Sequence, residues 1–233
     1  MGELSDIRRR TTACRLRAPV ARKAGVGEGK GQGSVRLFRE TRRHPDPRIL
    51  RIGCSDSRVP SEEITGAEPG ELFVQRNVAN LVLETDFNLR AVLQYSVEVL
   101  RVKHFIVCGH YNCGGVKHAM AQHGFGPVSK WLGPLKELYL LHKDQIESIT
   151  DPQGRWDRLV EINVTEQVKN LARTDIVQRA WWNERLPMLH GWIYNLRTGY
   201  LNELILMQAG DILSRNENQG YSDHDQRNSR FAD

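Results

Sequence analysis

A thiol, a carboxylate and a guanidinium occupy alternate positions in the stretch "CSDSRVP", residues 54–60. They belong to Cys54, Asp56 and Arg58, and they follow the apolar run "ILRIG", where a buried strand would end. Alternate residues of an extended chain point to the same side, so the three groups share one side of the strand end. A packed core would place apolar residues there, and this strand end is therefore predicted to carry chemistry.

A second set of chemically useful side chains follows in "GHYNCGG", residues 109–115, again directly after an apolar run. His110 and Cys113 are spaced so that both side chains can reach one ion from a turn. Together with Cys54 they form a thiolate, imidazole, thiolate set, which zinc favours. We therefore predict a Zn²⁺ ion bound by these three residues, with the fourth position open as in catalytic zinc sites.

Asp56 and Arg58 are the candidates to control that open position. Two thiolates neutralise the dication and leave a Lewis acid whose bound water can lose a proton near neutral pH. A carboxylate bound directly to the metal would exclude that water. Arg58 can hold Asp56 in a bidentate pair, so that the carboxylate stays off the metal and accepts a hydrogen bond from zinc-bound hydroxide.

Each motif also has an ordinary explanation when it is taken alone. A single cysteine such as Cys54 often packs as a small apolar residue, and Asp56 with Arg58 could be a plain surface ion pair. Cys108 is predicted in a strand core, and Cys14 lies in the basic N-terminal region without a predicted role. The prediction of a site depends on the two motifs following neighbouring strands, because ligand sites gather at such strand ends.

The elements that must position these residues can be read from the apolar pattern. Strands are predicted at 48–54, at 104–109 and from residue 71 toward residue 80. A helix is predicted over 86–102, with Thr85 or Asp86 as its N-cap. Strand, helix and strand in this order indicate a right-handed crossover and a parallel sheet.

The second half of the chain is predicted to be mostly helical and to end in a hairpin. Helices are expected from near Gly115, over 129–148 with a break at Gly133 and Pro134, over 155–172, and briefly before Pro187. Alternation around "NLRTG" then indicates an antiparallel hairpin at the sheet edge. The predicted fold is a single α/β domain over 46–209, with a mainly parallel central sheet flanked by helices, followed by a polar tail at 210–233.

The charge is unevenly placed along the chain. Residues 1–51 hold 14 Lys and Arg against 5 Asp and Glu, net +9, whereas the remainder holds 19 against 23, net −4. Residues 1–45 are predicted to be a poorly ordered basic arm, for which nucleic-acid binding and organelle targeting are minor alternatives. The chain lacks a run of about 18 apolar residues and an apolar leader segment, so we expect a soluble cytoplasmic protein without a membrane partner.

Over roughly residues 48–206 the chain resembles the β-class carbonic anhydrases. The resemblance is carried by "CSDSRVP", "ELFVQRNVAN", "CGHYNCGGV" and "HGWIY". It implies reversible hydration of carbon dioxide to bicarbonate and a proton by zinc-bound hydroxide, gated by the Asp56 and Arg58 dyad. It also implies a homodimer or homotetramer with the active site at the subunit interface.

The resemblance extends to the residues around the substrate. The backbone N–H of Gly114 is expected to steady the developing anion, and Val78 is expected to line an apolar carbon dioxide pocket. Tyr95 matches a supporting position, although a tyrosine on a helix is more often packing. Two other readings stay open: hydrolysis of carbonyl sulfide or carbon disulfide, and a non-catalytic zinc-stabilised binding module.

The chain departs from the family pattern in two places. In a bacterial subgroup, a tryptophan three residues before the first zinc cysteine helps to bind a regulatory bicarbonate. Here Arg76 and Tyr194 match that site, but the tryptophan position is Arg51, which either strengthens anion binding or fills the pocket. The arm also lacks the amphipathic pattern of the family's N-terminal helices, which leads to the hypothesis of a weakened dimer.

Overall fold

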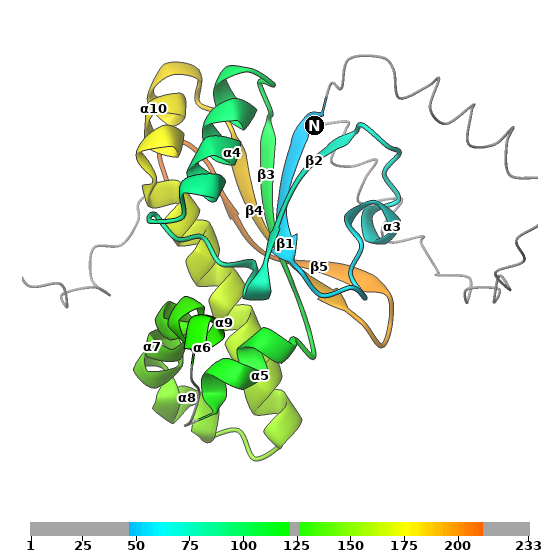
Figure 1. Ribbon diagram of the computed structural model, residues 1–233, viewed down its shortest axis with the longest axis vertical. Coiled ribbons are helices and arrows are strands. Elements are labelled where there is room, and N and C mark those ends of the chain that lie inside the picture. Colours follow the sequence, from blue (N-terminus) through cyan, green and yellow to red (C-terminus); the bar gives the residue numbers. More distant parts are fainter. Residues whose placement is uncertain (1–46, 122–125, 212–233) are drawn as a thin grey trace, which may run out of the picture.

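A five-stranded sheet lies at the centre of the computed structural model, which describes residues 47–121 and 126–211 (Figure 1). The strand order is β2-β1-β3-β4-β5. The strands are β1 (Ile49–Cys54), β2 (Leu72–Asn77), β3 (His104–His110), β4 (Met188–Asn195) and β5 (Tyr200–Met207). The β1 pairs with β2 and β3, and the β3 pair with β4, are parallel, whereas β4 and β5 pair antiparallel. The predicted α/β class and the edge hairpin are confirmed, while the predicted basic arm and most of the tail lie outside the described residues.

The connections between the first three strands are more structured than predicted. A short helix, α3 (Ser61–Thr65), follows β1. The strand expected to run toward residue 80 ends at Asn77, because Val78–Asn80 form a 3-10 turn in which Ala79 and Asn80 have positive φ. Such a left-handed backbone cannot continue a β ladder.

Helix α4 (Phe87–Glu98) connects β2 to β3 and confirms the predicted crossover helix. Its N-cap is Asp86, whose carboxylate accepts hydrogen bonds from the backbone N–H of Asn88 and of Leu89. The helix ends four residues before the predicted end at 102, because the chain turns through a left-handed Arg101 (φ 53).

Six helices make up most of the described chain between β3 and β4. They are α5 (Gly114–Met120), α6 (Gly126–Trp131), α7 (Gly133–Leu141), α8 (Lys143–Glu147), α9 (Pro152–Arg173) and α10 (Asp175–Glu184). Helix α9 begins three residues earlier than predicted, since Asp151 caps it and Pro152 suits its first turn. None of the described helices is both long and apolar enough to cross a lipid bilayer.

Buried apolar residues lie on both faces of the sheet, with Ile49, Ile106 and Trp192 on one face and a second cluster on the other. Helices α4, α9 and α10 cover the face that carries Leu50, Phe105 and Leu189. Figure 1 shows α5 to α8 gathered at the end of the sheet where β1 and β3 finish. These helices therefore lie beside the strand ends that carry the candidate site.

Close packing of a β5 side chain and of α9 against β4 requires a glycine at position 191. A Cβ built on Gly191 would lie 2.5 Å from Ile205 Cγ2 and 3.1 Å from side-chain carbons of Val164 and Val168. We expect Gly191→Ala to lower the free energy of unfolding by about 1–3 kcal/mol, as overpacked cores do. Gly133→Ala is the matched control, since no atom lies within 4 Å of its added Cβ. Urea unfolding of both variants measures the difference, and equal stabilities would refute this packing argument.

Candidate metal centre

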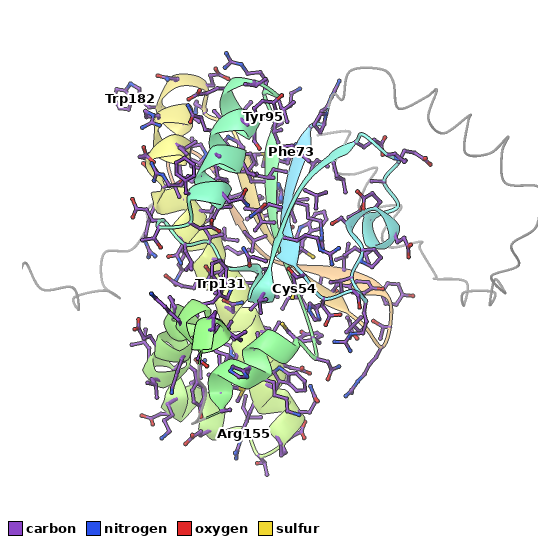
Figure 2. All side chains as sticks on the ribbon, viewed as in Figure 1. Cys54, Phe73, Tyr95, Trp131, Arg155 and Trp182 are labelled. Atoms are coloured by element: carbon purple, nitrogen blue, oxygen red, sulfur yellow. The ribbon has the colours of Figure 1, made fainter. Side chains whose placement is uncertain are left out.

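The three predicted zinc ligands come together at the carboxyl ends of β1 and β3. Cys54 ends β1, His110 ends β3 and Cys113 precedes α5. All three are buried, and their ligand atoms lie within 4.8 Å of one another. Figure 2 shows Cys54 at the end of the sheet that faces the helices α5 to α8. Within residues 47–121 and 126–211, no other group of His, Cys, Asp and Glu gathers three ligand atoms as closely.

The local backbone explains how residues from two strands meet. Strands β1 and β3 are parallel neighbours, with Gly53 opposite Cys108, so their next residues emerge at the same edge. After His110 the chain reverses through Asn112, which has a left-handed φ of 58°, and Cys113 returns toward the site. A Cβ on Gly115 would lie 3.0 Å from Val78 Cγ1, so the second glycine of "CGG" permits the close approach of α5.

His110 is prepared to bind a metal through Nε2. Its Nδ1 lies 2.9 Å from the carbonyl oxygen of Tyr111, and because a carbonyl only accepts, Nδ1 carries the proton. In the neutral ring Nε2 then presents a lone pair, and this atom is buried without a hydrogen-bond partner in a side chain that is 1% exposed. A buried polar atom without a partner is costly. A metal ion would satisfy it, so the residues present fit zinc.

The two cysteines form a hydrogen-bonded pair that favours one thiolate. Their sulfur atoms lie 3.9 Å apart. The hydrogen bond with Cys113 lowers the pKa of Cys54, and the same bond together with burial raises the pKa of Cys113. Thiolates are the form in which cysteine binds zinc, so the pair is partly prepared for a soft metal ion.

Asp56 and Arg58 form a bidentate pair beside the three ligands. Arg58 Nε donates to Asp56 Oδ1 at 2.9 Å, and Arg58 Nη2 donates to Oδ2 at 2.6 Å. Nη2 also donates to the carbonyl oxygen of Asn112, in the loop between two ligands. The hydrogen bonds from Arg58 lower the pKa of Asp56 to about 2, so the carboxylate is ionised at neutral pH. Its Oδ2 lies 3.8 Å from His110 Nε2, which places an ionised acceptor next to the ligand atoms.

The residues of the expected regulatory site lie on three different strands. Arg51 on β1 is 1% exposed and donates from Nη1 to the Ser61 hydroxyl at 2.7 Å. Arg76 on β2 donates to the carbonyl oxygens of Cys54 and Asp56. Tyr194 on β4 is buried opposite His110 in the sheet register, two strands away from β1.

Two indole N–H groups support the centre in a way that the sequence did not indicate. Trp156 on α9 donates to the carbonyl oxygen of Cys113 at 3.0 Å, and Trp131 on α6 donates to that of Val78 at 2.9 Å. Lys117 lies over the Trp156 ring at 5.1 Å from its centroid. Val78 and Gly114, the expected substrate residues, begin the 3-10 turn and α5 next to the ligands.

The family assignment follows from the comparison with known proteins. The family model described as carbonic anhydrase matches residues 49–201. A curated carbonic anhydrase of Emericella nidulans is 41% identical over 182 residues, 78% of this chain and 79% of that protein. The chain belongs to the β-class carbonic anhydrase family.

Solved structures support the same assignment. One, described as a tetrameric β-carbonic anhydrase of Sordaria macrospora, is 37% identical with a TM-score of 0.71 and covers 75% of this chain and 89% of its own. A Coccomyxa β-carbonic anhydrase in complex with acetazolamide is 36% identical with a TM-score of 0.71, covering 76% and 81%. The predicted β-class family, fold and enzyme class are thereby confirmed.

Proposed function

We propose that this carbonic anhydrase hydrates carbon dioxide reversibly to bicarbonate and a proton, with Zn²⁺ held by Cys54, His110 and Cys113. The observation that carries the zinc proposal is the buried His110 Nε2, which has no hydrogen-bond partner and lies among two thiols. When bound there, zinc supplies a Lewis acid that makes water acidic enough to act as a nucleophile near neutral pH.

The protein's own groups have separate roles in this proposal. Asp56, ionised and held by Arg58, accepts a hydrogen bond from the attacking water and orients it. The backbone N–H of Gly114 is proposed to stabilise the negative charge that develops on the substrate. Val78 is proposed to contact the apolar carbon dioxide. Its carbonyl is fixed by Trp131, which holds this wall of the site in place.

Parallel assays with three substrates test this choice of reaction. Carbon dioxide, carbonyl sulfide and carbon disulfide share a linear shape and an electrophilic carbon, so access to the metal decides between them. We expect measurable turnover with carbon dioxide and much slower turnover with the two sulfur compounds. Faster hydrolysis of either sulfur compound would replace the proposed substrate, and no turnover of any would favour a binding module.

We propose that bicarbonate does not regulate this enzyme, because Arg51 fills the position of the family's regulatory pocket. The guanidinium is buried and bonded to Ser61. Inhibition by bicarbonate is then expected to be hyperbolic, as for a product at a single site. Stopped-flow hydration at increasing bicarbonate measures the curve for the wild type and for Arg51→Leu. A sigmoidal curve that Arg51→Leu abolishes would instead assign Arg51 to a regulatory anion site.

We propose a homodimer as the minimal unit, able to pair into a tetramer. Support comes from the Sordaria protein, which is described as tetrameric. The half-exposed Tyr95, whose ring lies 5.8 Å from that of Phe73 near the sheet edge, offers an apolar surface to a second copy (Figure 2). Light scattering measures the oligomeric state. A weak dimer would agree with the hypothesis that the unusual N-terminal arm weakens the dimer, and a salt-resistant tetramer would refute that hypothesis of a weakened dimer.

The remaining proposals concern location and domain limits. We propose that the enzyme works in the cytoplasm, with carbon dioxide and bicarbonate as its ligands and neither membrane nor nucleic acid as partner. Residues 46–209 are proposed as the catalytic domain, flanked by the arm (1–45) and the tail (210–233). Limited proteolysis of the full chain, followed by mass analysis of the resistant fragment, tests these limits.

A further inference from the structure

The guanidinium of Arg76 bridges two main-chain carbonyl groups of the site. Its Nε donates to the carbonyl oxygen of Cys54 at 2.9 Å, and its Nη2 donates to that of Asp56 at 2.6 Å. Arg76 lies opposite Gly53 in the register of β2 with β1, so its side chain extends across the end of β1. One side chain thus joins the metal-ligand residue to the dyad residue.

The backbone around Asp56 has little other support from the sheet. The last main-chain bond between β1 and β2 runs from the Ser55 N–H to the Asn77 carbonyl at 2.9 Å. Beyond it, the Asp56 carbonyl accepts from the Val59 N–H at 3.2 Å, within the same turn. Arg76 therefore supplies a hydrogen bond from the sheet to this turn after the strand ladder has ended.

The shape of the guanidinium makes this a geometric constraint. Its N–H groups lie in one rigid plane, whereas a lysine offers a single flexible point charge. Two bonds from one plane fix the spacing and direction of the two carbonyls on either side of Ser55. They thereby limit how far Asp56 can move relative to Cys54. Arg58 then orients the Asp56 carboxylate, through bonds of 2.9 and 2.6 Å.

We propose that Arg76 is a positioning residue, which fixes the Asp56 backbone relative to Cys54 and so keeps the carboxylate at the correct place beside the metal. This inference deepens the proposed function and rests on it. Arg76 contacts carbonyl groups rather than the reacting atoms, so it acts through Cys54 and Asp56. If Arg76 instead acted only through its positive charge, a lysine at this position would serve as well.

The test compares Arg76→Gln and Arg76→Lys with the control Arg179→Gln. Arg179 is also an exposed arginine, but it pairs with Asp175 within α10. We expect both Arg76 variants to lose about 10- to 100-fold in kcat, the effect typical of groups that orient metal ligands, with KM unchanged. The control should match the wild type. Lysine is not expected to rescue activity, because it cannot bridge two carbonyls in one plane.

Cobalt-substituted protein gives a readout that does not depend on turnover. We expect the cobalt absorption bands to shift in both Arg76 variants, at full metal content and near-wild-type melting temperature, but not in Arg179→Gln. Recovery of both spectrum and kcat in Arg76→Lys would show that only charge matters and would overturn the inference. Unchanged spectra and rates in both Arg76 variants would also overturn the inference. An inactive wild type would refute the proposed function, while the spectra would still report on positioning.

Discussion

Replacing Cys54 with serine is expected to remove zinc from the protein and to reduce carbon dioxide hydration by more than about 100-fold. Losing a group that only orients a metal ligand reduces metal affinity or activity by up to about 100-fold, and losing a ligand itself should reduce them more. A serine hydroxyl stays protonated near neutral pH and does not replace a thiolate as a zinc ligand. Elemental analysis and stopped-flow hydration on the same preparation measure both effects.

Cys108→Ser is the matched control for this substitution. Cys108 is also buried and lies in the neighbouring strand β3, but its sulfur contacts only the Gly109 carbonyl among the bonds described (3.6 Å). The control should keep one zinc per chain and most of its activity. Wild-type zinc content in Cys54→Ser, or equal zinc loss in both variants, would contradict the proposed ligand set.

Replacing Asp56 with asparagine is expected to leave zinc bound but to reduce kcat by about 10²- to 10⁴-fold. This is the range for losing a positioned acid or base. The substitution keeps the shape of the side chain, but it removes the negative charge that Arg58 holds in a bidentate pair. The water would lose its ionised acceptor, and Arg58 would lose its partner.

The matched control is Asp86→Asn, at the N-cap of α4. Asparagine caps helices about as well as aspartate, so this variant should keep both stability and activity. Metal analysis, melting temperature and hydration rates complete the comparison. Wild-type rates in Asp56→Asn would show that the carboxylate has no catalytic role, and zinc loss would make it a structural support of the site.

The cluster of two cysteines and a histidine could be predicted from the sequence because its signal is local. Cys54, His110 and Cys113 each follow an apolar run or a turn, and parallel strands bring such residues to one edge. The dyad was predictable for the same reason, since Asp56 and Arg58 are two residues apart and bond directly. A short motif is enough to predict a site where its chemically useful residues directly follow predicted strands.

The supporting contacts could not be predicted, because they depend on tertiary packing. Trp156 bonds the Cys113 carbonyl across 43 positions of the chain, and Trp131 bonds that of Val78 across 53. Both tryptophans lie on helices whose apolar pattern gives no sign of these partners. The role inferred for Arg76 was likewise hidden, because the motif "RNVAN" does not show which carbonyls its guanidinium reaches.

The ends of the elements were also poorly determined by the apolar pattern. The second strand was predicted to start in residues 71–80 without a defined end, and the chain in fact turns after Asn77 through a left-handed backbone. Helix α9 began earlier than its apolar face, since the cap at Asp151 determines where it starts. Caps and turns therefore determine where these elements begin and end, and they carry little hydrophobic signal.

Stopped-flow carbon dioxide hydration on zinc-quantified protein, before and after chelation and zinc restoration, is the most direct test of the account. We expect one zinc per chain, activity that rises from about pH 6.5 to 9 as the bound water loses its proton, loss of activity with the metal, and recovery when zinc is returned. One zinc per chain without hydration anywhere in that range, or full hydration by metal-free protein, would contradict it.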